Sequence, residues 1–462
     1  MSITRRDALK ASGLAVGGLA LDSALNRGFA QTAGCLNGKC PGDNGEGNEN
    51  TFFTSLEKYC PLSEVVAPDE MRITFLGTSC IPRLAQECNS VFVELGSGDS
   101  FIFDCGSGVA AKYLAMKIPY SQMTKIFLTH LHGDHMSDLT HIYCFGPSLD
   151  RKSPLYVWGP SPSGVPDPVT HQLYDDGTKA FCSGFRELMR WHSESFSFLP
   201  TAYKSFVPPG WDPTQSKDGY DIVPFELDWR KAGVAYPPPP FDKDSDVVIT
   251  HFPAVHDRQG SMSYKLEWKS QGLSMIFSGD TKPNYYVIDQ ATQGVDVLIH
   301  ELVVSAEVWA EKNSDICPPP AQGVSMAQEI EDSSHTPEKA LGYILSQLKV
   351  PPRLAVATHF QATDDTIEGA LKNIRLWYPN GEVTFACDLL MLNVTKAGIR
   401  QRRGDVSSYA WNAPMPPTKS YPDLCTPKYH STLNSGYYMG GDPYAQLDPK
   451  ARIIPPSLYD SR

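Results

Sequence analysis

The feature that most constrains this chain is the run HLHGDH at residues 130–135, which follows an apolar segment at residues 126–128. Imidazole and carboxylate groups are the ligands that zinc accepts most readily. A single histidine is more often an ordinary surface or core residue. Three histidines and an aspartate within six residues are hard to explain in that way. The run therefore predicts a metal centre at the end of a buried strand.

Several residues of the same chemical kind occupy similar positions elsewhere in the chain. Asp104, Asp280 and His359 each come at or shortly after the end of a short apolar segment. Because active sites of open α/β sheets collect at the carboxyl ends of strands, these residues can meet in one place. His256 follows a further apolar segment after a short turn, and His251 competes with it for the same role.

The pattern from residue 71 onward alternates short apolar segments with turn signals and helical stretches, which indicates a layered α/β fold. One helix is predicted after His335, with Thr336 as its cap and Pro337 in its first turn. A second helix is predicted at residues 177–193. Strands are predicted at residues 72–76, 90–95, 101–103, 125–129, 155–158, 247–250, 264–268, 273–277, 295–299, 354–358 and 383–386.

The N-terminus has the pattern of an export signal. Arg5 and Arg6 precede an apolar run at residues 11–21, and small residues lead to a cleavage site after Ala30. The paired arginines are typical of a twin-arginine signal, and the run is too short to span a bilayer. We therefore expect a periplasmic or secreted protein with no transmembrane segment.

The remaining chain divides by composition. An extended N-terminal segment is expected at residues 31–68, and a catalytic domain at residues 69–400 with an aromatic and proline-rich insertion at about 160–245. Residues 401–462 are expected to form a surface tail. The formal net charge of −12 disfavours binding to a phosphate backbone. The eleven cysteines contain no CxxC pair, which argues against a cysteine-rich zinc site.

The ordered set of motifs resembles the metallo-β-lactamase superfamily, and within it the ribonuclease Z and arylsulfatase-like branch. The resemblance covers about residues 71–395. It implies a four-layer αβ/βα sandwich. The matching segments are residues 73–78, 104–106, 130–135, 256–264, 278–281 and 358–359, with two further signatures of the branch at His300-Glu301 and at Ser334-His335-Thr336.

The resemblance also implies a centre of two zinc ions, bridged by Asp280 and a hydroxide, in which Asp104 orients a ligand histidine. The same ligands accept Mn²⁺ or Fe²⁺. In the family that the chain resembles, a tyrosine follows the ligand histidine at the spacing that separates Tyr264 from His256, and this favours His256 over His251 as the ligand. The first zinc would take His130, His132 and His256, and the second would take Asp134, His135 and His359.

Hydrolysis by the bridging hydroxide is the activity that this centre implies, with Asp134, His335 and Glu301 as the catalytic residues. His335, assisted by Glu301, would stabilise the oxyanion or donate a proton to the leaving group; the alternative is that it only caps its helix. The expected substrate is a small molecule with a phosphodiester, sulfate ester or related ester. A lactonase, a weak β-lactamase or a non-catalytic metal-binding protein remain alternatives, and related enzymes are often homodimers.

The chain also departs from the branch in its export signal, its insertion and its tail, and these departures put a tRNA-processing role in doubt. The segments VWGP at residues 157–160 and GTK at residues 177–179, together with the export signal, resemble bacterial proteins labelled guanitoxin-biosynthesis metallo-hydrolases. That narrower resemblance implies a role in natural-product metabolism without naming a substrate.

Overall fold

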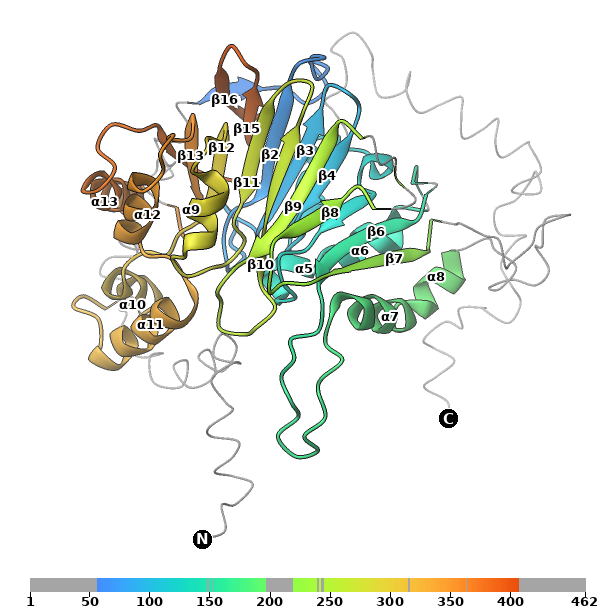
Figure 1. The fold of residues 1–462 in the computed structure, drawn as a ribbon, viewed down its shortest axis with the longest axis horizontal. Helices are drawn as coiled ribbons and strands as arrows, with labels where there is room; N and C mark the ends of the chain where they lie inside the picture. The colour runs from blue at the N-terminus through green and yellow to red at the C-terminus, as the bar shows by residue number, and fades with distance from the viewer. Residues whose placement is uncertain are drawn as a thin grey trace, which may run out of the picture. The chain divides into compact units, whose positions relative to one another are not determined.

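The computed structural model describes residues 56–406, apart from residues 148, 152, 197–218, 239–240, 242–244, 315 and 363. Two β-sheets pack face to face within these residues, and helices cover the outer face of each sheet (Figure 1). This is the four-layer αβ/βα sandwich that the sequence predicted. The predicted export signal lies outside the described residues, as does the tail from residue 407 onward.

The first sheet has nine strands in the order β1-β16-β15-β2-β3-β4-β5-β6-β7. From β4 to β7 the strands run parallel, so their carboxyl ends lie along one edge. The bounds are β1 Glu57–Tyr59, β2 Met71–Gly77, β3 Ser90–Leu95, β4 Ser100–Phe103, β5 Lys125–Phe127, β6 Leu155–Pro160, β7 Ile222–Leu227, β15 Leu390–Val394 and β16 Ile399–Gly404.

The second sheet has seven strands in the order β14-β13-β12-β11-β10-β9-β8. The four strands from β11 to β14 are parallel, and β8 to β11 pair antiparallel. The bounds are β8 Gly233–Tyr236, β9 Val247–Pro253, β10 Met262–Trp268, β11 Leu273–Phe277, β12 Val297–Glu301, β13 Leu354–Thr358 and β14 Val383–Phe385.

Two hydrophobic cores hold these layers together. The core between the sheets also includes side chains of the helices on the second sheet, whereas the other core lies between the first sheet and its own helices. Helices of the first sheet are α4 Val109–Ala115, η3 Tyr120–Gln122, α5 Gly133–Met136, α6 Leu139–Phe145, α7 Thr178–Leu188 and α8 Arg190–Phe196, and the others are α9 Tyr285–Ala291, α10 Ala306–Ser314, α11 Ala321–Ser334, α12 Glu338–Ser346 and α13 Asp364–Arg375.

The strand sequences explain why the sheets are buried on both faces. In β4, Phe101 and Phe103 enter the core between the sheets, while Ile102 enters the core under the helices. Side chains alternate between the two faces of a strand, so a strand covered on both faces is apolar at nearly every position. This is the pattern by which the apolar segments could be recognised in the sequence.

The structure contains a strand at each of the eleven predicted ranges, with ends shifted by a few residues. It adds β1, β7, β8, β15 and β16, which the sequence analysis did not predict. The strands β7 and β8 come from the segment at 160–245 and form one edge of each sheet. The described helices include none that is both long enough and apolar enough to span a membrane.

One detail of the predicted helix after His335 was wrong. The N-cap residue of α12 is Pro337, and this end of the helix has no side-chain capping hydrogen bond. The hydroxyl of Thr336 instead donates to the carbonyl oxygen of Thr281 at 2.7 Å. The hydroxyl therefore ties the start of α12 to the loop that follows Asp280, a longer-range contact that outcompetes local capping.

Candidate metal centre

The carboxyl ends of β4, β5, β11 and β13 bring the predicted ligands to one place. Asp104 follows β4, and the loop after β5 carries the histidine run into the short helix α5. Asp280 and His359 follow β11 and β13, which both pair with β12 in parallel register. Strands that run in the same direction end on the same edge, so these side chains converge.

Three of these strand ends turn through a left-handed backbone conformation. The φ angles are 57° at Asp104, 58° at Gly279 and 68° at His359. This conformation costs a residue other than glycine about 1–2 kcal/mol, so it persists only where the surrounding structure holds it. A Cβ atom at Gly279 would lie 2.5 Å from Cβ of Thr129, so glycine is needed there for space as well.

The first set of donor atoms consists of three histidine nitrogens. Nδ1 of His132 lies 3.0 Å from Nε2 of His130 and 3.2 Å from Nε2 of His256. All three atoms lie within 4.8 Å of one another. Three imidazole nitrogens that face each other at these distances suit the coordination of one zinc-like ion.

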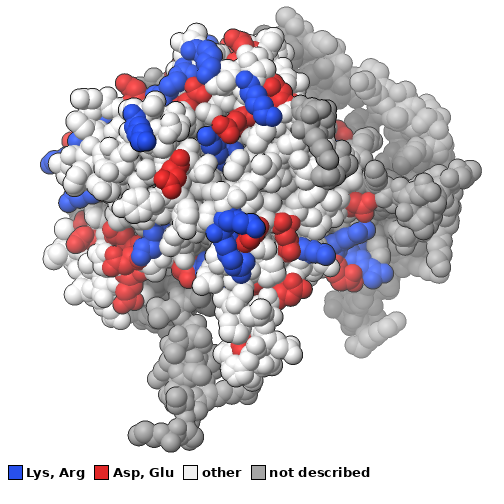
Figure 2. Space-filling model, in the orientation of Figure 1, with Lys and Arg blue, Asp and Glu red and all other residues white. Residues whose placement is uncertain are grey.

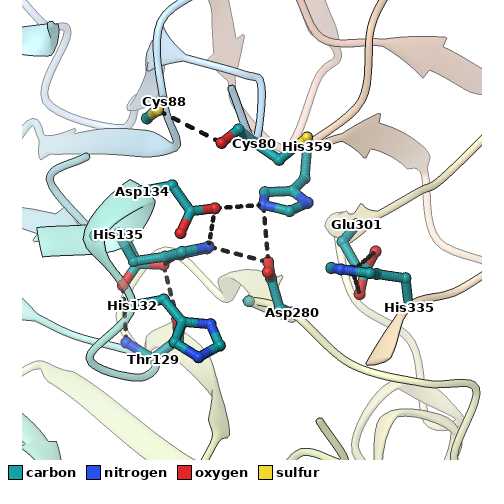
Figure 3. A network of polar contacts seen from close by, with 12 residues as sticks. Cys80, Cys88, Thr129, His132, Asp134, His135, Asp280, Glu301, His335 and His359 are labelled. Carbon is teal, nitrogen blue, oxygen red and sulfur yellow. Dashed lines mark hydrogen bonds and ion pairs between the residues drawn. The ribbon is translucent and has the colours of Figure 1, made fainter. Parts of the chain in front are cut away.

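The second set lies beside the first and combines carboxylates with imidazoles (Figure 3). Oδ2 of Asp134 lies 3.4 Å from Nε2 of His135 and 3.3 Å from Nε2 of His359. Oδ1 of Asp280 lies 3.2 Å from Nε2 of His135 and 3.3 Å from Nε2 of His359. The four residues offer ligand atoms within 4.8 Å of one another.

Asp280 lies between the two sets. Its Oδ1 faces the second set, while its Oδ2 lies 4.0 Å from Nε2 of both His130 and His256 in the first set. Its side chain is only 3% exposed. One buried carboxylate therefore presents a different oxygen to each set of donors, as a bridging ligand would.

Outer partners fix the orientation of the imidazole rings. Oδ2 of Asp104 accepts a hydrogen bond from Nδ1 of His135 at 2.7 Å, which leaves Nε2 of that ring as the free donor atom. Nδ1 of His256 bonds the carbonyl oxygen of Ser334 at 3.0 Å, with the same consequence. Such outer hydrogen bonds are typical of metal-binding histidines.

Two buried atoms at the meeting point of the donor sets have no hydrogen-bond partner, namely Nε2 of His135 and Oδ1 of Asp280. Buried polar atoms are nearly always partnered in folded proteins. An imidazole lone pair and a carboxylate oxygen that face each other fit a cation held between them. The nitrogen and oxygen donors suit a divalent ion such as zinc.

The buried carboxylates of the site also favour the binding of a positive charge. Burial holds the pKa of His130 well below its ordinary value, so this ring is neutral and able to bind metal. Burial acts in the same direction on His135, but the carboxylates of Asp280, Asp134 and Asp104 outweigh it and hold the pKa of His135 well above the ordinary value. A bound cation would satisfy the same carboxylates.

His335 lies next to both donor sets and is paired with an acid. Its ring centroid is 5.3 Å from that of His256 and 5.5 Å from that of His359. Its Nδ1 lies 3.0 and 3.1 Å from the two carboxylate oxygens of Glu301, the last residue of β12. Burial lowers the pKa of His335, but the Glu301 carboxylate outweighs it and raises that pKa to about 9.

The structure separates the two histidines that competed for one position. His256 joins the first donor set, whereas Nε2 of His251 lies 3.3 Å from the carbonyl oxygen of Asp228. The imidazole of His251 packs against Gly233 of β8, where a Cβ atom would lie 2.8 Å from its Cε1. His251 thus belongs to none of the candidate metal groups among the described residues.

Asp257 and Cys80, for which the sequence indicated no role, also lie at the site. Oδ1 of Asp257 is 3.7 Å from Nε2 of His132 and 3.6 Å from Nε2 of His256. Cys80 lies close to His359 in Figure 3, and burial, with the charges of nearby acids, raises its pKa to about 12. The position of Asp257 directly after His256 was a signal that could have been read, whereas the position of Cys80 required the fold.

Comparison with known proteins agrees with this geometry. The family model described as the metallo-beta-lactamase superfamily matches residues 84–143, which include Asp104 and the histidine run. This part of the chain is therefore similar to the metallo-β-lactamase superfamily. The other residues of the two donor sets lie outside the matched segment, and only the structure brings them next to the histidine run.

The relatives that match this chain include ribonucleases Z. The ribonuclease Z of Methanosarcina acetivorans is 23% identical over 346 residues, which are 70% of this chain and 98% of that protein. The ribonuclease Z of Crocosphaera subtropica is 37% identical over 92 residues, which are 20% of this chain and 30% of that protein. The chain is therefore similar in sequence to ribonucleases Z, with one match over nearly the whole length of the relative.

Solved structures of the superfamily cover a similar part of the chain. Human tRNase Z, short form, is 20% identical with a TM-score of 0.43, over 69% of this chain and 98% of that one. The metallo-beta-lactamase fold protein YhfI from Bacillus subtilis is 15% identical with a TM-score of 0.45, over 71% of this chain and 100% of that one. The narrower resemblance to guanitoxin-biosynthesis proteins stays a prediction.

Proposed function

We propose that the protein is a dinuclear metal hydrolase that cleaves a phosphodiester, sulfate ester or related ester of a small molecule. The observation that carries the proposal is Asp280, whose two oxygens face two separate sets of donor atoms. A single ion would need only one of these sets. Zinc is the ion that we expect, and Mn²⁺ or Fe²⁺ would suit the same nitrogen and oxygen donors.

The residues present would divide between the two ions as the donor sets do. His130, His132 and His256 would hold the first ion, with Asp134, His135 and His359 holding the second and Asp280 between them. When bound, two divalent ions would lower the pKa of a coordinated water and neutralise negative charge that develops on the substrate. Because every donor of the second set is largely buried, it would exclude bulk water from the reacting atoms.

His335 would hold a proton for the departing oxygen of the substrate. Glu301 keeps the ring in place through both of its carboxylate oxygens, and also accepts the backbone N–H of Thr281 at 2.6 Å. The loop that follows Asp280 therefore fixes the carboxylate of Glu301, and this carboxylate fixes the imidazole ring of His335. A positioned general acid of this kind contributes about 10²–10⁴-fold in rate.

A small substrate is favoured over a polynucleotide by the charges of the described surface. Arg258, which lies two residues after His256, forms an ion pair with Asp176, so its charge is partly neutralised within the protein. On the face seen in Figure 2, the described Lys and Arg residues are mixed with Asp and Glu rather than gathered in a continuous band. Proteins that bind nucleic acid through the backbone usually present a basic stripe or patch.

The test is hydrolysis of bis(p-nitrophenyl) phosphate and p-nitrophenyl sulfate by protein with measured zinc content. We expect turnover of at least one ester, with a loss of at least 100-fold in Asp134→Ala and His359→Ala. His251→Ala is the matched control, because it removes a buried histidine outside the donor sets. Turnover unchanged in the two site variants would contradict the proposed centre.

Parallel assays with a lactone and with nitrocefin separate the remaining alternatives. Turnover of only these substrates would support a lactonase or β-lactamase, and no turnover by fully metallated protein would support a metal-binding role without catalysis. For His335→Ala, we expect a larger rate loss with alkyl esters than with p-nitrophenyl esters. A p-nitrophenolate ion leaves without a proton, so equal losses would contradict the role of His335 as an acid.

Export through a twin-arginine-type signal is part of the same proposal and rests on the sequence of residues 1–30. Fusion of these residues to a folded reporter, with Arg5 and Arg6 replaced by lysine as the control, tests it in bacterial cells. Loss of transport in the lysine variant would support the signal. A homodimer, which the resemblance suggests, can be tested by light scattering of the mature protein.

A further inference from the structure

We propose that Gln86 is a positioning residue for the metal ligand His359, through a clamp that its side-chain amide makes on the turn after β13. The proposal rests on the function proposed above, because it takes His359 to be a ligand of the second ion. Gln86 is 273 residues away from His359 in the sequence and belongs to none of the candidate metal groups.

The clamp uses both ends of the amide. Nε2 of Gln86 donates to the carbonyl oxygen of Phe360 at 3.2 Å, and Oε1 accepts from the backbone N–H of Ala362 at 3.0 Å. The two backbone groups flank one residue of the turn that directly follows His359. Gln86 is only 3% exposed, so water could not replace these bonds without a rearrangement.

The turn needs such a support because it is strained and irregular. His359 has a φ of 68°, a conformation that costs a histidine about 1–2 kcal/mol. The turn lies between the end of β13 and the start of α13, so the sheet and helix ladders do not satisfy all of its backbone groups. An unsatisfied buried backbone group costs about 1–3 kcal/mol, and the Gln86 amide satisfies two of them.

Gln86 is itself fixed by the loop that carries it. Arg83 and Gln86 exchange backbone hydrogen bonds at 2.7 and 3.1 Å, which closes a tight turn. Nε2 of Gln86 also donates to Oγ1 of Thr78 at 2.9 Å, and that hydroxyl donates to Asp388 at 2.6 Å. The buried carboxylate of Asp388 in turn accepts the backbone N–H of Glu87 at 2.7 Å, so the clamp has a rigid base.

Only an amide suits this position. Gln86 must donate toward Phe360 and Thr78 through Nε2, and its Oε1 accepts from Ala362 and from Nη2 of Arg83. Glutamate has the same shape, but it would place an oxygen against the carbonyl of Phe360. Methionine has a similar length and can make neither bond. Both substitutions should let the His359 turn relax and move its imidazole away from Asp134 and Asp280.

The experiment measures zinc binding to the apo full-length protein in competition with a chromophoric chelator, which resolves two affinities. The variants are Gln86→Met, Gln86→Glu, Asp134→Ala and the double variant of Gln86→Met with Asp134→Ala. Asn393→Leu is the matched control, since Asn393 is also a buried amide, bonded to Glu70 and to Arg402, in β15 away from the donor sets. Circular dichroism of each variant reports whether it folds.

We expect one ion to bind as in the wild type and the other 10–100-fold more weakly in both Gln86 variants, the range usual for an outer partner of a ligand. Asp134→Ala should weaken the same ion, and the double variant should lose little more. Wild-type affinity for both ions in a folded Gln86 variant would overturn the inference, as would equal weakening of both ions or the same loss in Asn393→Leu. A wild-type protein that binds no ion would instead refute the proposed function.

Discussion

Replacement of Asp104 by asparagine tests whether an outer carboxylate sets the protonation of a ligand histidine. The Asp104 carboxylate accepts three hydrogen bonds: Oδ1 from the N–H of Thr129 at 2.8 Å, and Oδ2 from Oγ1 of Thr129 at 2.8 Å and Nδ1 of His135 at 2.7 Å. An asparagine can accept at only one of these two atoms, and its NH₂ group must occupy the other.

Both orientations of the asparagine are unfavourable for metal binding. With NH₂ toward His135, Nδ1 of the ring must accept, so its proton moves to Nε2, the atom that faces Asp280 at 3.2 Å. With NH₂ toward Thr129, two donors oppose each other in a site of 0% exposure, which costs about 1–3 kcal/mol. We therefore expect zinc affinity to fall about 10–100-fold, equivalent to about 1.4–2.8 kcal/mol.

Chelator competition on the Asp104→Asn variant measures this loss directly. Asp138→Asn is the control, because Asp138 also accepts a backbone N–H, that of Ala110 at 2.7 Å, and belongs to none of the candidate metal groups. We expect the control to bind zinc as the wild type does. Unchanged affinity in a folded Asp104→Asn variant would refute the reasoning that this carboxylate fixes the tautomer of His135.

Three further outcomes follow from the structure. Gly279→Ala should lower the free energy of unfolding by about 2–4 kcal/mol, because Gly279 has a left-handed φ and a Cβ atom there would lie 2.5 Å from Thr129. Gly184→Ala is the control, because a Cβ atom at Gly184 would meet open space. Equal urea midpoints for the two variants would contradict this prediction. Burial and nearby acids raise the pKa of half-buried Glu331 to about 7, whereas its pKa in the unfolded chain is about 4.5. The folded protein therefore holds the proton of Glu331 more tightly than the unfolded chain does. The stability that this adds is fully present below pH 4.5 and is lost as the pH rises through 7. Glu331→Gln should therefore add about 1–2 kcal/mol of stability at pH 8 and little at pH 4 in urea titrations, the amount being reduced by solvent screening. Removal of metal with EDTA should lower the thermal midpoint of unfolding, because an ion at 1,000 times its Kd adds about 4 kcal/mol to the free energy of unfolding. Addition of zinc should restore the midpoint. An unchanged midpoint would count against a structural contribution of the ions.

The layers of the fold could be predicted from the sequence because their strands are buried on both faces. A segment such as Phe101-Ile102-Phe103 fills one core with two side chains and the other core with one, so its apolar character is continuous. The strand β16 escaped prediction for the opposite reason. Its sequence IRQRRG is strongly charged, and the buried Arg402 within it donates to Asn393 of β15 and to Glu64.

The donor sets could likewise be inferred because imidazole and carboxylate side chains, the groups that can bind a metal, come shortly after buried strands. The histidine run, Asp280 and His359 all obey that rule. The choice between His251 and His256 could not be made from the strand pattern alone, since both lie in or just beyond β9. The structure distinguishes them by direction: the side chain of His251 packs toward β8, and that of His256 faces the other imidazoles.

The supports of the donor sets were beyond a sequence argument because they depend on distant backbone groups. A glutamine within a loop carries no signal of what it binds, and the partners of Gln86 at residues 360 and 362 become neighbours only after both sheets have formed. Asp104 is different, since a carboxylate directly after a buried strand must find partners or be excluded. The polar residues that sequence can place are therefore those whose burial is dictated by their own strand. Those that hold a strained turn from another part of the chain, as Gln86 holds the turn after His359, become visible only when their bonds are traced in three dimensions.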